Sequence, residues 1–245
     1  MAPLKPLHAL HRFARGLATG LGTLGTDLIE ISFPQRCPGC GVPAGPERLL
    51  CPQCWRAIPR AGVTVCVRCL SRGRAGDACT RHPGFRAGAA WVYDEAAALV
   101  VGALKFEGRT ALAPVLAAEM AAGVPPGPRV DLVTPVPLHP ARCRERGYNQ
   151  SRLLAEELAI RIEAPFVDGL LARRRATRAQ TGLPAAERRE NVSGAFEVVK
   201  PHAVRGRCVL LVDDVVTTGA TLAACLEALE AAGAGARAAV LAWAA

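Results

Sequence analysis

Two adjacent carboxylates followed by hydroxyl side chains form the chemically most informative segment of this 245-residue chain. Asp213 and Asp214 come directly after the apolar run 209–212, and residues 217–221 read Thr-Thr-Gly-Ala-Thr. The apolar run predicts a buried strand and residues 221–232 predict a helix. The two acids would then stand at the carboxyl end of a strand, where ligands of open α/β sheets bind.

The residue types of this segment indicate a ribose that carries a phosphate. Hydroxyls, backbone N–H groups and the positive end of the following helix together bind a phosphate dianion, and these would come from Thr217, Thr218, Gly219, Ala220 and Thr221. Asp213 and Asp214 can accept hydrogen bonds from a sugar diol and help to hold Mg²⁺. The alternative is that the acids only cap the helix, but capping requires one Asp rather than two.

Cysteine pairs separated by two residues predict two zinc sites. Seven of the ten cysteines lie between residues 37 and 79. The first predicted site has four cysteines, and the second has three cysteines and a histidine: Cys37, Cys40, Cys51 and Cys54, then Cys66, Cys69, Cys79 and His82. The spacing suits tetrahedral Zn²⁺, and four protein ligands leave no open position, which is typical of structural zinc.

Disulfides or a thioredoxin-like redox pair are the other interpretations of these cysteines. A redox pair needs a single Cys-x-x-Cys beside a β-α unit, so the repeated pairs favour metal. His82 is the less certain ligand because it can also be an ordinary surface histidine. Outside this block, Cys208 and Cys225 are expected in the core, and Cys143 lies among arginines.

The charge is strongly basic and dominated by arginine. The chain has 30 Lys and Arg against 21 Asp and Glu, a net charge of +9, and only three of the basic residues are Lys. Residues 142–152 carry +3 and residues 173–190 carry +4. These segments suit either a phosphate site or a DNA strand, and they can also be solvated basic loops. Aromatic residues make up 4% and do not alternate with the arginines as in a base-stacking surface.

Alternating strand and helix patterns from about residue 88 predict a parallel sheet with helices on both faces. The expected strands are 89–93, 130–136, 196–199, 209–212 and 238–243, and the expected helices are 96–104, 110–122, 149–162 and 221–232. No apolar stretch approaches the ~20 residues of a membrane span. The leader segment 1–32 is a weak secretion signal, so we expect a cytoplasmic protein.

Residues 209–222 resemble the motif with which type I phosphoribosyltransferases bind 5-phosphoribosyl-1-diphosphate (PRPP). Further segments are similar to the ComF family of competence-associated proteins: Leu104-Lys-Phe106, Val133-Thr-Pro-Val-Pro-Leu-His-Pro140, Arg146-Gly-Tyr-Asn-Gln-Ser151, Gln180-Thr-Gly-Leu183 and Arg189-Glu-Asn-Val-Ser-Gly-Ala-Phe196. The resemblance implies a small double zinc ribbon at 33–86 and an α/β, parallel-sheet type I phosphoribosyltransferase-like domain at 88–245. His82 departs from the family, which usually has a fourth Cys there.

The resemblance also implies roles for individual residues. Asp213 and Asp214 would meet the ribose hydroxyls directly or through Mg²⁺, and 217–221 would bind the 5′-phosphate. The pyrophosphate loop would contain Arg142, Arg144 and Arg146. A mobile loop that closes over the substrate would contain Arg173, Arg174, Arg175, Arg178, Gln180 and Arg189.

Two functions agree with these residues. The first is a phosphoribosyltransferase that uses Mg²⁺·PRPP and an unidentified nitrogen acceptor. No acceptor-binding hood is evident, and one would have to come from residues 94–128 or from the zinc ribbon. The second is a non-catalytic module on the same fold that senses a nucleotide or binds single-stranded DNA. The resemblance implies a setting in DNA uptake during natural transformation, with a DNA-translocating helicase and other competence proteins as partners.

Overall fold

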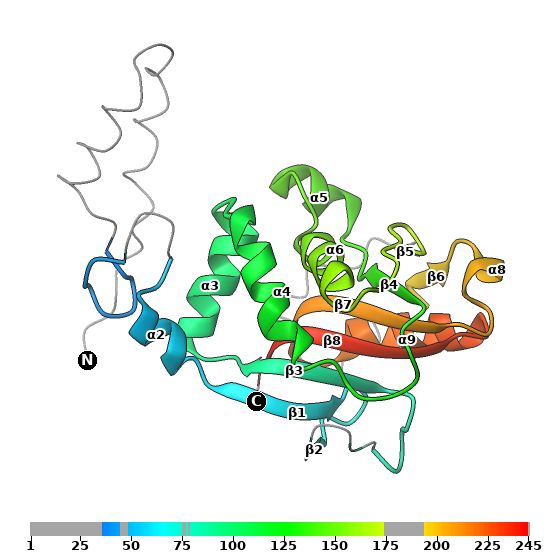
Figure 1. Cartoon of the computed structure of the whole chain (residues 1–245). Helices are drawn as coiled ribbons and strands as arrows, with labels where there is room; N and C mark the ends of the chain where they lie inside the picture. Colours follow the sequence, from blue (N-terminus) through cyan, green and yellow to red (C-terminus); the bar gives the residue numbers. More distant parts are fainter. Residues whose placement is uncertain (1–35, 45–48, 75–76, 78, 174–193, 245) are drawn as a thin grey trace. The chain divides into compact units, whose positions relative to one another are not determined.

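The computed structural model describes residues 36–44, 49–74, 77, 79–173 and 194–244 (Figure 1). The chain divides into two compact units, residues 1–51 and 52–245. In the described part of the first unit, the backbone N–H of Cys37 donates to the carbonyl of Val42 (2.8 Å), and the backbone N–H of Gly41 donates to the carbonyl of Cys37 (2.7 Å). These bonds close a tight turn that contains Cys40.

A six-stranded sheet forms the centre of the second unit, in the order β2-β1-β3-β8-β7-β4. Its strands are β1 (Arg60–Cys66), β2 (Arg72–Arg74), β3 (Arg86–Val92), β4 (Leu132–Pro135), β7 (Cys208–Val216) and β8 (Gly235–Trp243). Strands β3, β8, β7 and β4 are parallel, whereas β1 pairs antiparallel with both β2 and β3. The mixed α/β fold with a mostly parallel sheet confirms the predicted fold class.

Helices cover both faces of this sheet (Figure 1). They are α2 (Pro52–Ala57), α3 (Glu95–Phe106), the short η1 (Thr110–Leu112), α4 (Ala113–Ala121), α5 (Pro140–Arg146), α6 (Gln150–Arg161), α8 (Pro201–Val204) and α9 (Ala220–Ala231). On β7, Val209 and Leu211 share one core cluster with Leu226 of α9. The alternate residues Leu210 and Val212 are equally buried outside that cluster, because successive side chains of a strand point to opposite faces.

Capping side chains account for where the helices α3 and α6 begin. The side chain of Asp94 accepts from the backbone N–H of Ala97 (2.8 Å) and caps α3. The side chain of Asn149 accepts from the backbone N–H of Ser151 (3.0 Å) and caps α6. Among the described helices, none is long and apolar enough to cross a membrane.

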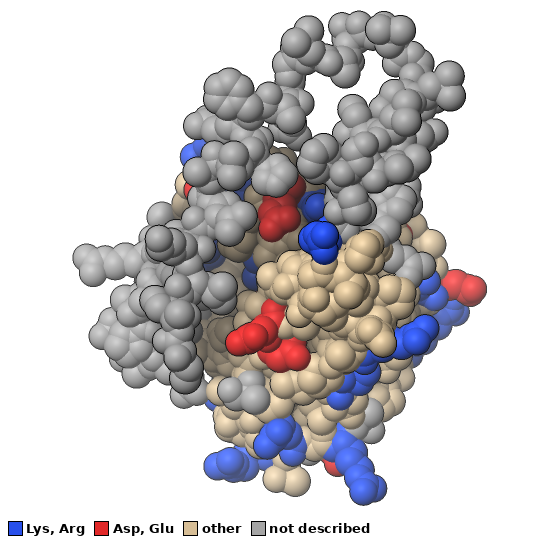
Figure 2. All heavy atoms as spheres, turned by 90° about the vertical axis from the view of Figure 1, so that its left-hand side faces the viewer, with Lys and Arg blue, Asp and Glu red and all other residues tan. Residues whose placement is uncertain are grey.

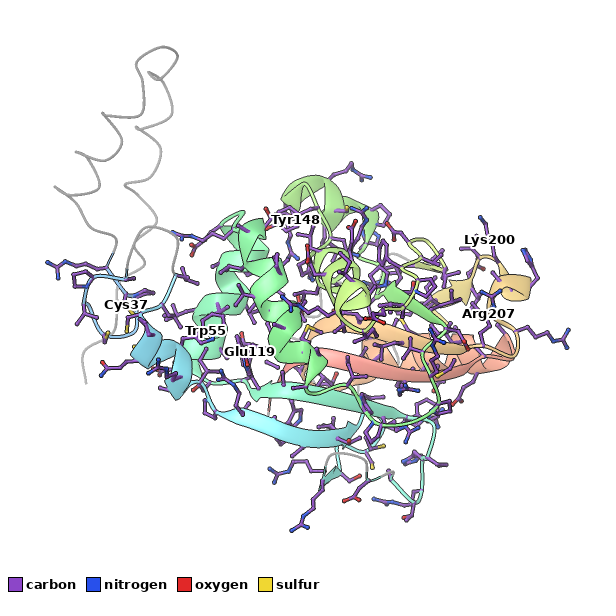
Figure 3. The ribbon with its side chains drawn as sticks, viewed as in Figure 1. Cys37, Trp55, Glu119, Tyr148, Lys200 and Arg207 are labelled. Atoms are coloured by element: carbon purple, nitrogen blue, oxygen red, sulfur yellow. The ribbon has the colours of Figure 1, made fainter. Side chains whose placement is uncertain are left out.

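Glu119 of α4 joins three elements of the second unit. Its carboxylate accepts from the indole N–H of Trp55 in α2 (3.3 Å) and of Trp91 in β3 (3.2 Å), and it pairs with Arg60 of β1 (2.9 Å). Figure 3 shows Trp55 and Glu119 side by side beneath α3. The carboxylate thereby provides an acceptor for two indole donors, and Trp91 is fully buried.

Several elements differ from the expected ranges. The strand expected at 209–212 continues to Val216, so both acids lie within β7. The strand expected at 196–199 is β6 (Phe196–Val198), and it pairs antiparallel with β5 (Leu171–Arg173) in a separate two-stranded sheet. The short helices α5 and α8 were not expected. The domain limits 33–86 and 88–245 remain predictions, but β1 and β2 of the zinc segment belong to the main sheet.

Candidate functional site

A cavity of about 570 Å³ opens at the carboxyl ends of β4 and β7. It is lined by the acid pair, by the whole segment 217–221, by the turn that follows β4 and by the first residues of α6. These segments are far apart in sequence. The parallel pairing of β4 with β7 brings their carboxyl ends to one edge of the sheet.

The two acids of β7 have different partners. Asp213 accepts a hydrogen bond from the hydroxyl of Ser151 (2.7 Å), at the start of α6. Asp214 forms an ion pair with Lys105 of α3 (Nζ to Oδ1, 2.9 Å), and its side chain is only 5% exposed. The two carboxylates are therefore held by different helices, so the site depends on how α3 and α6 pack against β7.

The environment of Asp213 disfavours its charged form. Burial raises the pKa of Asp213 to about 7, and the neighbouring charge of Asp214 acts in the same direction. The Oδ2 atom of Asp214 is buried and has no hydrogen-bond partner among the described residues. Carboxylate oxygens are preferred ligands of Mg²⁺. The acid pair thus has the donor chemistry and a free acceptor atom for a cation, and a cation would favour the ionised form of Asp213.

The segment 217–221 turns from the end of β7 into α9. Gly219 has φ +73° and precedes the first helical residue, Ala220. A Cβ at Gly219 would lie 2.0 Å from the carbonyl oxygen of Val67, so this position has room only for glycine. The backbone N–H groups at the start of α9 adjoin the cavity, an arrangement that binds phosphate.

The predicted pyrophosphate arginines separate in space. Arg142 of α5 lines the cavity. Arg146 lies over the ring of Phe106 (5.2 Å) and donates to Oε1 of Gln150, and neither Arg144 nor Arg146 belongs to the cavity lining. Because α5 is a helix, its successive arginines point in different directions.

Arg173 is the one member of the predicted mobile loop within the described residues, and it lines the cavity at the end of β5. Burial lowers the pKa of Arg173, and the positive charge of Arg142 adds to the effect. Both arginines thus line the same cavity. Arg174, Arg175, Arg178, Gln180 and Arg189 lie outside the described residues.

Several cavity residues were not among the predicted site residues, and three of them bear on the chemistry of the site: Lys105, Ser151 and Tyr93. Lys105 and Ser151 contact the acid pair directly. Both stand in segments that resemble ComF motifs, Leu104-Lys-Phe106 and Asn149-Gln-Ser151, and the motifs were the available signal. Tyr93 follows β3 without any such signal.

The second predicted zinc site is assembled in the structure. Its four ligand atoms all lie within 4.8 Å of one another. Cys69 Sγ is 3.7 Å from Cys79 Sγ, and Nδ1 of His82 is 3.6 Å from Cys66 Sγ. Tetrahedral zinc with Zn–S bonds of about 2.3 Å places its sulfurs about 3.8 Å apart. Hydrogen bonds from Ser71 lower the pKa of Cys69 to about 6, which favours the thiolate that zinc binds.

Three ligands of the first predicted zinc site belong to the first unit. The sulfurs of Cys37, Cys40 and Cys51 lie within 4.8 Å of one another, with 3.5 Å between Cys40 and Cys51. Cys54 follows Cys51 by three residues, in the first turn of α2. No disulfide joins any of the ten cysteines. The clusters have the ligands and the spacing of structural zinc sites.

Comparisons with known proteins match both parts of the chain. A double zinc ribbon domain matches residues 28–81, and a phosphoribosyl transferase domain matches residues 149–244. The chain is 33% identical to the DNA utilization protein YhgH of Escherichia coli O157:H7 over 193 residues, which cover 76% of this chain and 80% of that protein. Competence protein F of Haemophilus influenzae is 41% identical over 93 residues, 38% of this chain and 41% of that protein. Competence protein ComFC of Streptococcus pneumoniae is 27% identical over 194 residues, 77% of this chain and 84% of that protein.

Proposed function

The chain belongs to the ComF family, and on that premise we propose that it binds PRPP with Mg²⁺ in the cavity at the carboxyl ends of β4 and β7 and serves DNA uptake in the cytoplasm. The observation that carries this proposal is the joint placement of the acid pair and the segment 217–221 on one cavity wall. A sugar diol and its 5′-phosphate need these two kinds of group side by side.

The arrangement supports group transfer from PRPP to a nitrogen acceptor. In that reaction the bond from C1 of the ribose to the pyrophosphate oxygen breaks, and its electron pair leaves with pyrophosphate. The acceptor nitrogen then bonds to C1 and loses a proton. Arg142 and Arg173 are placed to stabilise the negative charge of the leaving group. Such catalysis depends on positioning and electrostatics and needs no protein nucleophile.

The acceptor side of the cavity is the less defined part. Tyr93 and Lys105 line it, from the end of β3 and from α3. Both lie at or near the segment 94–128, from which an acceptor hood was expected. The lining offers an aromatic face and a cation, but Lys105 is already paired with Asp214, so the acceptor stays unidentified.

Single-stranded DNA and a DNA-translocating helicase remain the proposed partners in uptake. On the face shown in Figure 2, most of the visible basic side chains lie toward the lower and right-hand edges, and others lie beside the acidic residues near the upper centre. We propose a DNA-binding role that accompanies the PRPP pocket rather than one that replaces it, because the acid pair and the whole segment 217–221 line that cavity.

Calorimetric titration of Mg²⁺·PRPP tests the proposal. We expect binding by the wild type and none by the Asp213→Asn/Asp214→Asn variant. Asp168→Asn is the matched control, because Asp168 is exposed and pairs with Arg152 (2.9 Å) outside the cavity lining. Zinc content and thermal unfolding establish that each protein is folded. If the double variant binds PRPP as tightly as the control, the assignment of the pocket is wrong.

A further inference from the structure

A second cavity, of about 470 Å³, opens at the amino ends of the strands, where β3, β7 and β8 begin. The PRPP pocket adjoins the carboxyl ends, so the two cavities lie at opposite ends of the sheet. Four arginines line the second cavity: Arg86, Arg129, Arg207 and Arg237. Figure 3 shows Arg207 at the end of the sheet where β7 begins, near α8.

Arg237 is buried at the base of this cavity. The residue is 4% exposed, and its guanidinium donates to the carbonyl of Pro128 (2.7 Å) and to Sγ of Cys208 (2.9 Å). Its Nε atom is buried without a hydrogen-bond partner among the described residues. No carboxylate forms an ion pair with it in the described part of the chain. A buried charge of this kind is costly unless an anion compensates it.

Arg86 brings a second positive charge close to the first. Nη2 of Arg86 and Nη1 of Arg237 both lie 3.1 Å from the position that a Cβ on Gly127 would occupy. Asp131 and Glu230 also line the cavity, but Asp131 accepts from the backbone N–H of Cys208 (2.8 Å), and neither acid pairs with an arginine among the described residues. The lining therefore carries more positive than negative charge.

We propose that this cavity binds a phosphate oxyanion, with Arg86, Arg129 and Arg237 as its ligands. Guanidinium groups present planar pairs of N–H donors that match phosphate oxygens. The oxyanion can belong to a free phosphate compound or to the backbone of a single strand, and both offer the same oxygens. The site is independent of the PRPP pocket and of its function.

A purely structural role is the competing explanation for Arg237, because its bond to Pro128 fastens the segment that precedes β4 to the base of the sheet. That role does not need Arg86 or Arg129. Arg129 is exposed, and neither residue forms an ion pair among the described residues. Variants of these two residues therefore separate the explanations without disturbing the buried arginine.

The test compares Arg86→Ala/Arg129→Ala with the wild type and with Arg161→Ala. Arg161 is an exposed arginine of α6 whose guanidinium donates to the carbonyl of Pro114. Each protein is titrated with inorganic pyrophosphate by calorimetry. A labelled single-stranded oligodeoxynucleotide is titrated in parallel by fluorescence anisotropy at several salt concentrations. Thermal unfolding checks the fold of every variant.

For a free oxyanion, we expect the double variant to bind one pyrophosphate fewer than the control, with unchanged oligonucleotide affinity. For a strand backbone, we expect a loss of oligonucleotide affinity of about tenfold in 0.1 M salt. The slope of log K against log salt would also decrease by about 1.4, since each lost contact to a single strand removes about 0.7. If the folded double variant binds both probes like the control, the site does not exist.

Discussion

The carbonyl oxygen of Val67 lies directly against Gly219, so closely that a Cβ on the glycine would come within 2.0 Å of it. Val67 belongs to the turn between Cys66 and Cys69, and Gly219 belongs to the predicted 5′-phosphate loop. The same turn holds Arg68, which pairs with Glu227 of α9. The second zinc turn thus forms the wall against which the phosphate loop and its helix are packed.

Gly219→Ala tests whether this contact sets the geometry of the loop. The new methyl group cannot fit beside Val67, and φ +73° is strained for alanine. We expect a loss of about 1–3 kcal/mol in the free energy of unfolding and a loss of at least tenfold in PRPP affinity, measured by urea unfolding and calorimetry.

Gly169→Ala is the control, because Gly169 has φ +70° and a Cβ added there would have no atom within 4 Å. The free energy of unfolding of that variant should fall by about 1 kcal/mol, and its PRPP binding should be retained. Equal PRPP affinity in the two variants would contradict the prediction.

Loss of the second zinc ion should weaken the phosphate loop through the same wall. Zinc coordination supplies folding energy to a segment with little core of its own. In Cys79→Ser we expect the zinc content to fall from two ions per chain to one, and PRPP affinity to fall at least tenfold. Cys40→Ser should lose the other ion and bind PRPP as the wild type does. Metal analysis and calorimetry measure the two effects, and similar affinities in both variants would exclude the coupling.

The sequence predicted the parts of the fold that depend on local pattern. The run Val209–Val212 is apolar because β7 is buried on both faces, and the cysteine spacing reflects the four-ligand requirement of zinc. The contact between Val67 and Gly219 joins residues far apart in the chain and has no local signal. Helix α5 did have a local signal in the sequence, since Pro140 stands at its start and Gly147, with φ +85°, ends it. The missed helix left the divergent directions of Arg142 and Arg146 unforeseen.

The ion pair between Lys105 and Asp214 should stabilise the folded protein. The Asp214 side chain is 5% exposed and that of Lys105 is 22% exposed, so the pair is only partly screened by water. We expect Lys105→Met to destabilise the protein by about 2–4 kcal/mol, because it leaves a buried charge unpaired. Lys105→Met/Asp214→Asn should recover at least about 1 kcal/mol of that loss. Urea unfolding of the four proteins in the double-mutant cycle gives the coupling energy, and strictly additive losses would show that the pair is not coupled.

The pKa of Asp213 predicts how ligand binding depends on pH. Burial and the adjacent Asp214 raise this pKa to about 7, whereas the unfolded chain has the ordinary value near 3.8. The folded protein without ligand therefore holds the proton between these values, so its free energy of unfolding should fall as pH rises from about 4 to 7. The ionised carboxylate is the form that accepts ribose hydroxyls and binds Mg²⁺. The affinity for Mg²⁺·PRPP should therefore rise with pH, by up to about tenfold per pH unit below 7, and level off above 8.

The Asp213→Asn variant should lose the part of this pH dependence that exceeds the titration of PRPP itself. Calorimetry from pH 5.5 to 8.5 measures both proteins, and parallel profiles would show that Asp213 does not titrate on binding.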